Sequence, residues 1–153
     1  MYELFSLLER KNLCFKSFHK LCHDFLEEIS QENVENLTTF QQNRQSLISV
    51  LESLEKDVKI YLSETGLDVE ATKQKVSSED RQKLSALLQE KDSLVHNILD
   101  LDLQILKHID QIKNDTIQKL QSIQKGRKTV SAYKSPLQQV EKAENTKYFD
   151  KKA

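Results

Sequence analysis

The pattern that decides the fold lies at residues 37–61, LTTFQQNRQSLISVLESLEKDVKIY. Apolar residues recur in this stretch at alternating steps of three and four, which is the spacing of one face of an α-helix. Strict alternation of the two steps is typical of a heptad seam between packed helices. Arg44 is the one polar member of this stripe, and we expect it to lay its stem along the apolar surface or to fix the register of the pairing. The stripe comprises Leu37, Phe40, Arg44, Leu47, Leu51, Leu54, Val58 and Tyr61.

A second stripe of similar spacing precedes the first and predicts a helix over residues 2–30. Its members are Leu4, Leu8, Lys11, Phe15, Phe18, Cys22, Phe25 and Ile29, with Lys11 as the polar member. The stripe fades after residue 30, which predicts a kink or a short turn near residues 30–34. Either Ser30 or Asn33 has the short oxygen-bearing side chain that suits the N-cap of the next helix, which we expect over residues 33–65.

The third stripe is the longest and predicts a single helix over residues 78–125. The segment Ser77–Asp80 supplies capping oxygens and first-turn acids at its start. A helix of about 48 residues is about 70 Å long, so it can pack along both earlier helices. Its stripe comprises Leu84, Leu87, Lys91, Leu94, Ile98, Leu101, Ile105, Ile109, Ile112, Thr116, Leu120 and Ile123.

Only two glycines and one proline interrupt the 153 residues. A β-sandwich or an α/β domain of this length needs many more turn residues, so a few long helices fit the composition best. Gly66 and Gly126 lie where a residue with positive φ closes a helix, and Pro136 prevents a helix from running smoothly onward. The sequence therefore predicts an all-α protein. We expect an antiparallel bundle of three long helices in residues 1–126, followed by a flexible basic tail, residues 127–153, that is partly disordered or forms a short helix.

Charge is distributed unevenly along the chain. Residues 1–118 hold 14 Lys and Arg against 21 Asp and Glu, whereas residues 119–153 hold nine against three. The positive charges of the tail are spread out, without the dense runs typical of nucleic-acid binding, so we expect no nucleic-acid partner. The chain has no run of 18 apolar residues and no basic leader followed by an apolar stretch, which predicts a cytoplasmic protein without stable membrane insertion. Cys14 and Cys22 are too far apart along one helix for a disulfide, so we expect free thiols.

Catalytic motifs are absent from the sequence. It lacks a glycine-rich phosphate loop and the serine, cysteine and zinc-protease motifs that place nucleophiles or metals, so we expect no enzyme, no cofactor and no metal. His19 and His23 have the four-residue spacing that can share a metal, but no third ligand is evident, and surface histidines are the favoured interpretation because Cys22 points toward the apolar stripe. The acids expected on solvated helix faces include Glu27, Glu28, Asp100 and Asp102.

The apolar face of the third helix continues for several turns beyond Ile105. If the earlier helices leave it uncovered, it is a surface that binds another helix. Folding back onto the same bundle is an equally good interpretation of the pattern. The candidate binding residues are Ile109, Ile112, Ile117, Leu120, Ile123 and Val130.

Three segments carry a resemblance to a known family. A polar and acidic break, EEISQEN at residues 27–33, precedes a leucine-rich helix, LISVLESLE at residues 47–55, and the last helix ends in IQKGRKTVSAY at residues 123–133. This arrangement resembles the FlgN-type flagellar export chaperones, although the family is commonly acidic where this tail is basic. The resemblance implies a cytoplasmic chaperone for type III flagellar export. Such a protein binds the amphipathic C-terminal helix of hook-filament junction proteins, prevents their premature association and delivers them to the export gate. Tyr133 matches by position the tyrosine that the family associates with docking at an export-gate component.

Other functions stay open. A sister chaperone for the filament cap or for flagellin would share the helical architecture and differ in its client. A coiled-coil adaptor or structural protein would use the stripe at residues 37–61 as a dimer interface. We therefore expect a monomer or a homodimer.

Overall fold

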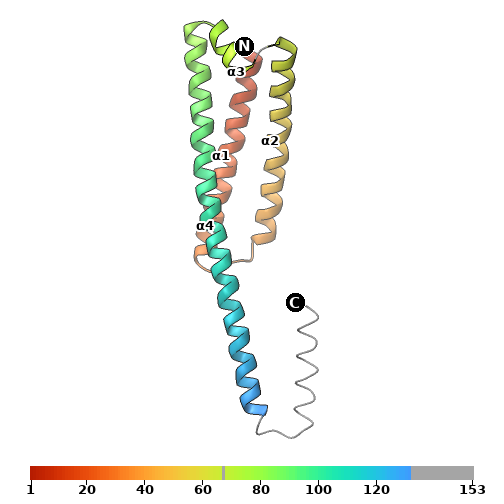
Figure 1. The fold of residues 1–153 in the computed structure, drawn as a ribbon, viewed down its shortest axis with the longest axis vertical. Coiled ribbons are helices and arrows are strands. Elements are labelled where there is room, and N and C mark those ends of the chain that lie inside the picture. Colours follow the sequence, from red (N-terminus) through yellow and green to blue (C-terminus); the bar gives the residue numbers. More distant parts are fainter. Residues whose placement is uncertain (67, 132–153) are drawn as a thin grey trace. The chain divides into compact units, whose positions relative to one another are not determined.

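The structure is a computed structural model that describes residues 1–66 and 68–131. All secondary structure in these residues is helical, so the all-α fold class is confirmed for the described part of the chain (Figure 1). The chain divides into two units, Met1–Ile109 and Asp110–Ala153. The helices are α1 (Tyr2–Ser30), α2 (Leu37–Thr65), α3 (Val69–Lys75) and α4 (Ser78–Ser131).

Within the first unit, α1 and α2 lie side by side and run in opposite directions (Figure 1). The Cys14 thiol lies 3.7 Å from the carbonyl oxygen of Leu47, which it faces as a donor. Further along α1, the rings of Phe25 and Phe40 stack with their centroids 4.1 Å apart. The contact partner thus moves back along α2 as α1 advances, as expected of two helices joined by a short connection.

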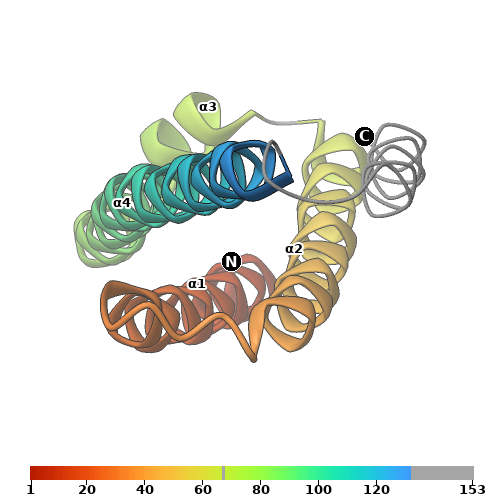
Figure 2. The same ribbon diagram turned by 90° about the horizontal axis from the view of Figure 1, so that it is seen from below.

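The part of α4 in the first unit lies beside α1 (Figure 2), and both helices run in the same direction (Figure 1). Lys83 forms an ion pair with Glu9 at 3.3 Å. One turn later, the buried Asn12 side chain donates a hydrogen bond of 3.1 Å to the carbonyl oxygen of Leu87. Here the contact partner advances along α4 as α1 advances, because α2 has already reversed the chain once.

The buried side of each helix is largely the stripe that the sequence predicts. Lys11 is buried with its stripe, as expected of the polar member. Each large apolar side chain buried in this way contributes about 1.5–3 kcal/mol, so these contacts are the main stabilising term of the first unit. Buried members of the three stripes include Leu4, Leu8, Phe18, Cys22, Phe25, Ile29, Phe40, Leu54, Val58, Leu84, Ile98 and Ile105.

α1 ends at the predicted residue, but α2 begins four residues later than predicted, at Leu37. Neither Ser30 nor Asn33 is its N-cap, which is Asn36. The Ser30 hydroxyl instead donates to the carbonyl oxygen of Glu27 at 2.8 Å, so it belongs to the last turn of α1. The side-chain oxygen of Asn33 accepts a hydrogen bond within the connecting loop, from the amide two residues later, and is therefore used before the helix starts.

The two glycines have different roles. Gly66 closes α2 with φ of 67°, the left-handed conformation predicted for it. Gly126 does not close a helix, because α4 continues through it to Ser131. A glycine inside a helix costs only about 1 kcal/mol relative to alanine, and the long polar residues on either side of Gly126 are good helix formers.

A short helix, α3, fills the stretch between the two long helices that showed no clear pattern in the sequence. Asp68 caps it by accepting a hydrogen bond of 2.6 Å from the amide of Ala71. The start of α4 follows the prediction, since the Ser77 hydroxyl oxygen accepts from the amide of Asp80 at 3.2 Å. The N-termini of α3 and α4 are therefore each capped by a side-chain oxygen that accepts a hydrogen bond from a first-turn amide.

Candidate protein-binding surfaces

The predicted binding residues of the second unit lie on exposed turns of α4. Ile112 is half-buried, whereas Ile117, Leu120 and Ile123 are 41%, 43% and 52% exposed. The backbone of Val130 is helical, but its side chain and the whole of Tyr133 lie outside the described residues. Because the exposed side chains are apolar and recur at steps of three, they form a surface that another helix can cover.

A second group of exposed apolar residues was not predicted. Leu99, Leu103 and Leu106 of α4 are 57%, 66% and 56% exposed. The sequence predicted an apolar stripe through Ile98, Leu101 and Ile105, and the face of α4 beside that stripe is apolar as well. The signal was present in the sequence as a second series of leucines at steps of four and three, beginning one residue after Ile98.

A groove of about 410 Å³ lies between α2 and α4 in the first unit. Its position explains why Leu106 is exposed and Ile109 is only half-buried, since both face this groove. Ile109 is the predicted binding residue that lies in the first unit. The apolar lining comprises Leu37, Phe40, Ile48, Ile105, Leu106 and Ile109.

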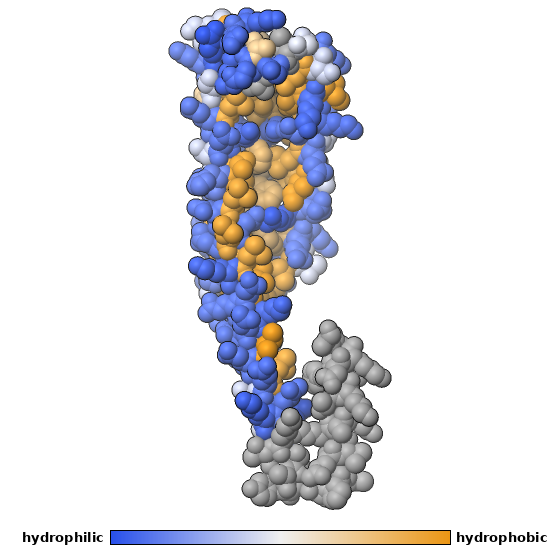
Figure 3. All heavy atoms as spheres, viewed as in Figure 1, coloured by the Kyte–Doolittle hydropathy of each residue, from blue (hydrophilic) through white to orange (hydrophobic). Residues whose placement is uncertain are grey.

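Two further hollows of the first unit are lined in part by the same side chains of α1. One, of about 430 Å³, lies between α1 and α2, and the other, of about 350 Å³, lies between α1 and α4. Phe15 and Lys11 of α1 line both hollows. Figure 3 shows hydrophobic surface running lengthwise along this face of the first unit, bordered by polar side chains. The three helices thus leave apolar surface uncovered along one face.

Two of the ion pairs between helices of this unit each include a charge that is largely covered, Lys11 in one and Asp102 in the other. Lys11 of α1 binds Glu55 of α2, and the hydrogen bond from the ammonium group lowers the pKa of the Glu55 carboxyl. Arg44 of α2 binds Asp102 of α4 through both nitrogens of its fork, one of them at 2.8 Å.

Asp102 was predicted on a solvated helix face, and this prediction is wrong. Its side chain is only 16% exposed and accepts hydrogen bonds from Arg44. The guanidinium group of Arg44 also lies over the Phe18 ring, 5.3 Å from the ring centroid. Arg44 therefore fixes α2 against α1 and α4 at one level, which is the register-setting role that the heptad pattern suggested.

Cys22 is buried against the same carboxylate. Its thiol lies 3.7 Å from Asp102 Oδ1. Burial, followed by the negative charge of Asp102, raises the pKa of the Cys22 thiol to about 12. A thiol of that pKa holds almost no thiolate at neutral pH, so Cys22 is an apolar packing residue rather than a nucleophile. Cys14 and Cys22 are both free thiols, as predicted.

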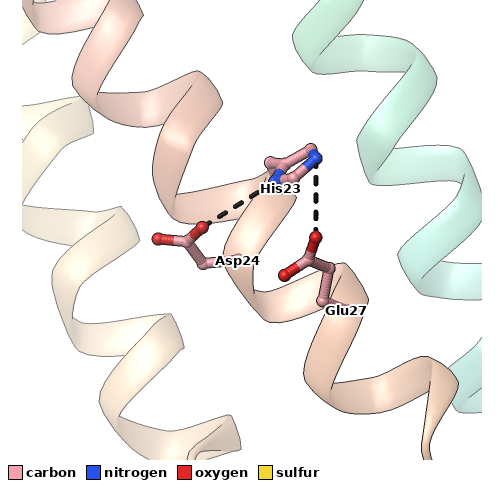
Figure 4. Close-up of side chains that lie close together, drawn as sticks. All are labelled: His23, Asp24 and Glu27. Atoms are coloured by element: carbon pink, nitrogen blue, oxygen red, sulfur yellow. Dashed lines mark ion pairs between the residues drawn. The ribbon is translucent and has the colours of Figure 1, made fainter.

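The histidine pair of α1 lies on the surface. His19 and His23 stack with ring centroids 6.5 Å apart. The two ring nitrogens of His23 face carboxylates, Asp24 at 3.7 Å and Glu27 at 3.9 Å (Figure 4). The prediction found no third ligand beside the histidines, whereas the structure gathers His23, Asp24 and Glu27 with their ligand atoms within 4.8 Å of one another. All three are exposed and can satisfy one another as ion pairs.

Comparison of the chain with protein-family models, with curated proteins and with solved structures gave no match. No helix of the described residues combines the length and the apolar character that a membrane span requires. The exposed apolar residues of α4 and the open face of the first unit are therefore the features from which function is argued.

Proposed function

We propose that this protein is a cytoplasmic export chaperone of the FlgN type, built on an antiparallel bundle of three long helices, α1, α2 and α4. It binds the amphipathic C-terminal helix of hook-filament junction proteins, keeps these clients from associating prematurely and delivers them to the export gate. Its partners are thus the junction proteins and an export-gate component, with no nucleic acid and no stable membrane insertion.

One observation carries this proposal, the exposed apolar surface of α4 in the second unit. Ile117, Leu120 and Ile123 are each more than two-fifths exposed on a long helix. An amphipathic client helix that buries a large aliphatic side chain gains about 1.5–3 kcal/mol for each, provided that the pair excludes water. Ile112 continues the surface toward the start of the second unit, and Ile109 and Val130 are further residues that we propose contact the client.

The proposed mechanism needs neither catalysis nor a cofactor. A client helix with an exposed apolar face is prone to self-association, and covering that face lowers its tendency to aggregate. Binding through helix faces is reversible, which suits a protein that must release its client at the gate. Tyr133 is the proposed contact with the gate.

Two alternatives stand beside this proposal. A chaperone for the filament cap or for flagellin would bind a different amphipathic helix with the same residues, so the helix that α4 prefers separates it from the first proposal. A coiled-coil adaptor or structural protein would use the stripe at residues 37–61 as a dimer interface, but Phe40, Leu54 and Val58 of that stripe are buried within the first unit.

The proposal is tested by the affinity of the full chain for a synthetic peptide of the C-terminal helix of a hook-filament junction protein. Leu120→Asp and Ile123→Asp each place a charge in the interface, so binding should weaken by about 10- to 100-fold. Gln118→Asp is the matched control, because residue 118 lies almost opposite residue 120 on the helix. Tyr133→Ala should leave peptide binding unchanged and weaken capture of the export-gate component.

Circular dichroism should show the same helicity in all four variants, because the three described side chains are exposed. If both aspartate variants at residues 120 and 123 bind the peptide as tightly as the unchanged chain, the proposed client site is wrong. If the unchanged chain binds flagellin or filament-cap helices and not the junction helix, the site stands and the client is corrected.

A further inference from the structure

One segment of α1 gathers two kinds of metal-binding side chain. His23, Asp24 and Glu27 each offer one ligand atom, and these atoms lie within 4.8 Å of one another (Figure 4). His19 lies one turn earlier and forms with His23 the four-residue spacing at which two histidines of a helix chelate a metal ion. Two independent features, a spacing in the sequence and a cluster in the structure, thus meet at His23.

Ion pairing inside the cluster leaves its ligand atoms available. His23 Nδ1 lies 3.7 Å from Asp24 Oδ1, and His23 Nε2 lies 3.9 Å from Glu27 Oε1, whereas hydrogen bonds of this kind span about 2.7–3.2 Å. A histidine carries at most one positive charge against the two negative charges of the carboxylates. Among the described residues no lysine or arginine forms an ion pair with Asp24 or Glu27. The cluster therefore keeps an excess of negative charge that a cation can neutralise.

We propose that His23, Asp24 and Glu27 bind a divalent metal ion of the zinc type, with His19 as the fourth ligand. Two ligand atoms of one tetrahedral zinc ion lie about 3.3–3.6 Å apart, close to the separations from His23 to each carboxylate. His23 contributes one ring nitrogen. The carboxylate that faces the other nitrogen reaches the ion by rotation of its own side chain, since both carboxylates are more than half exposed.

The ring of His19 is placed to complete the site. Its centroid lies 6.5 Å from that of His23, and two imidazoles bound to one tetrahedral zinc ion have centroids about 5 Å apart. A rotation of the two side chains closes this difference without any change in the helix. We therefore expect His19 to strengthen binding, while His23, which belongs to both the pair and the cluster, is indispensable.

The chemistry of the donor atoms selects the class of ion. Imidazole nitrogen together with carboxylate oxygen suits Zn²⁺ and the neighbouring transition metals, whereas Ca²⁺ and Mg²⁺ prefer oxygen ligands alone. Cys22 precedes His23 in the chain but is fully buried, and its thiol lies 3.7 Å from Asp102 Oδ1 of α4. The proposed site therefore contains no thiolate.

All four ligands belong to α1, so the site involves the first unit alone and does not rest on the proposed chaperone function. An ion at this position links successive turns of α1 shortly before the helix ends at Ser30. An ion that binds the folded chain more tightly than the unfolded chain raises the midpoint of thermal unfolding. We expect zinc to raise this midpoint for the unchanged chain and not for a chain that lacks His23.

The test is isothermal titration of the full chain with zinc chloride in a buffer without chelators. We expect one ion per chain. His23→Ala, Asp24→Asn and Glu27→Gln should each weaken binding by about 10-fold or more, because each removes one ligand or its charge. His19→Ala should weaken binding by less than His23→Ala does. The matched controls His96→Ala and Asp100→Asn change an exposed histidine and an exposed aspartate of α4, and both should bind zinc like the unchanged chain.

Cobalt(II) in place of zinc identifies the donor atoms by absorption spectroscopy, and the spectrum should show nitrogen and oxygen ligands without a thiolate charge-transfer band. Such a band would assign the ion to Cys14 or Cys22 and overturn the proposal. So would the absence of binding at zinc concentrations up to about 1 mM, or equal affinity of His23→Ala and the unchanged chain. Circular dichroism shows whether the variants keep their helicity, as expected of substitutions at side chains that lie on the surface. Peptide binding is measured separately, so failure of this proposal leaves the chaperone proposal standing.

Discussion

Arg44 and Asp102 bind each other between α2 and α4 at a level where both side chains are largely covered. The hydrogen bond that the Arg44 guanidinium donates to Asp102 raises the pKa of the guanidinium, so Arg44 stays charged. The phenyl ring of Phe18 covers one face of the guanidinium. Together these contacts make the pair a register device: a shift of α2 by one turn would separate the charges and leave both short of partners.

Removal of one partner should therefore destabilise the fold. Asp102→Ala leaves the guanidinium of Arg44 partly buried without its acceptor and should lower the free energy of unfolding by about 1–3 kcal/mol. The double variant R44M/D102L removes both charges and should recover most of that loss, because apolar replacements of a buried pair are often neutral. Urea unfolding followed by circular dichroism measures both effects.

Asp100→Ala is the control for this experiment. Asp100 is exposed and lies two residues from Asp102 on the same helix, so its removal should change stability by less than about 0.5 kcal/mol. Equal effects of Asp100→Ala and Asp102→Ala would mean that the pair contributes nothing specific to the fold.

The partnership of Arg44 illustrates what the sequence can predict at this scale. Its place in the stripe followed from spacing alone. The burial of Asp102 could not be predicted in the same way. Asp102 comes one residue after Leu101 of the stripe, a position that on an ideal amphipathic helix faces solvent. Only the placement of α2 against α4 brings the two charges together, and that placement is a tertiary property.

At the scale of the helices, the two glycines show that a helix end depends both on the residue and on its structural context. Gly66 has φ of 67°, which only glycine adopts without cost, and the end of α2 was predicted correctly. Gly126 also follows a helical stripe in the sequence but lies within α4. Glycine permits a helix end without enforcing one, so its presence alone could not distinguish the two cases.

Alanine at these two positions should have opposite effects. Gly66→Ala forces a Cβ into the left-handed region and should destabilise the protein by about 1–2 kcal/mol. Gly126→Ala should increase the helicity of the second unit and leave the unfolding midpoint unchanged or higher, since alanine favours helices by about 1 kcal/mol. No atom lies within 4 Å of either added Cβ, so crowding does not confuse the comparison. Destabilisation of similar size by both variants would contradict this assignment of their roles.

Of the other helix boundaries, some were predicted from the sequence and others were not. The capped start of α4 followed from Ser77 and the acids after it. The late start of α2 was not predicted. Ser30 and Asn33 both have a side chain that can cap a helix, but each forms a different hydrogen bond, Ser30 in the last turn of α1 and Asn33 in the connecting loop. α3 was missed because seven residues are too few to show a helical period.

For the whole molecule, the sequence located the apolar surface of the second unit but not the full extent of the exposed apolar residues. Ile117, Leu120 and Ile123 were predicted to be candidates for binding another helix, and they are exposed. Leu99, Leu103 and Leu106 were not predicted as exposed residues. When a helix has two adjacent apolar faces, a search for a single apolar stripe finds only the stronger of the two. Covering these faces takes a second molecule, which the helical period of one chain does not identify.

The central claim is that the surface of residues 109–123 binds an amphipathic client helix. The most direct measurement is hydrogen exchange of the full chain with and without the junction-protein peptide, at a concentration where the chain is monomeric. The account predicts that the peptide slows exchange of the backbone amides of residues 109–123. Binding that protects only residues around the hollows at Phe15 and Ile48, or no protection anywhere with saturating peptide, would contradict it.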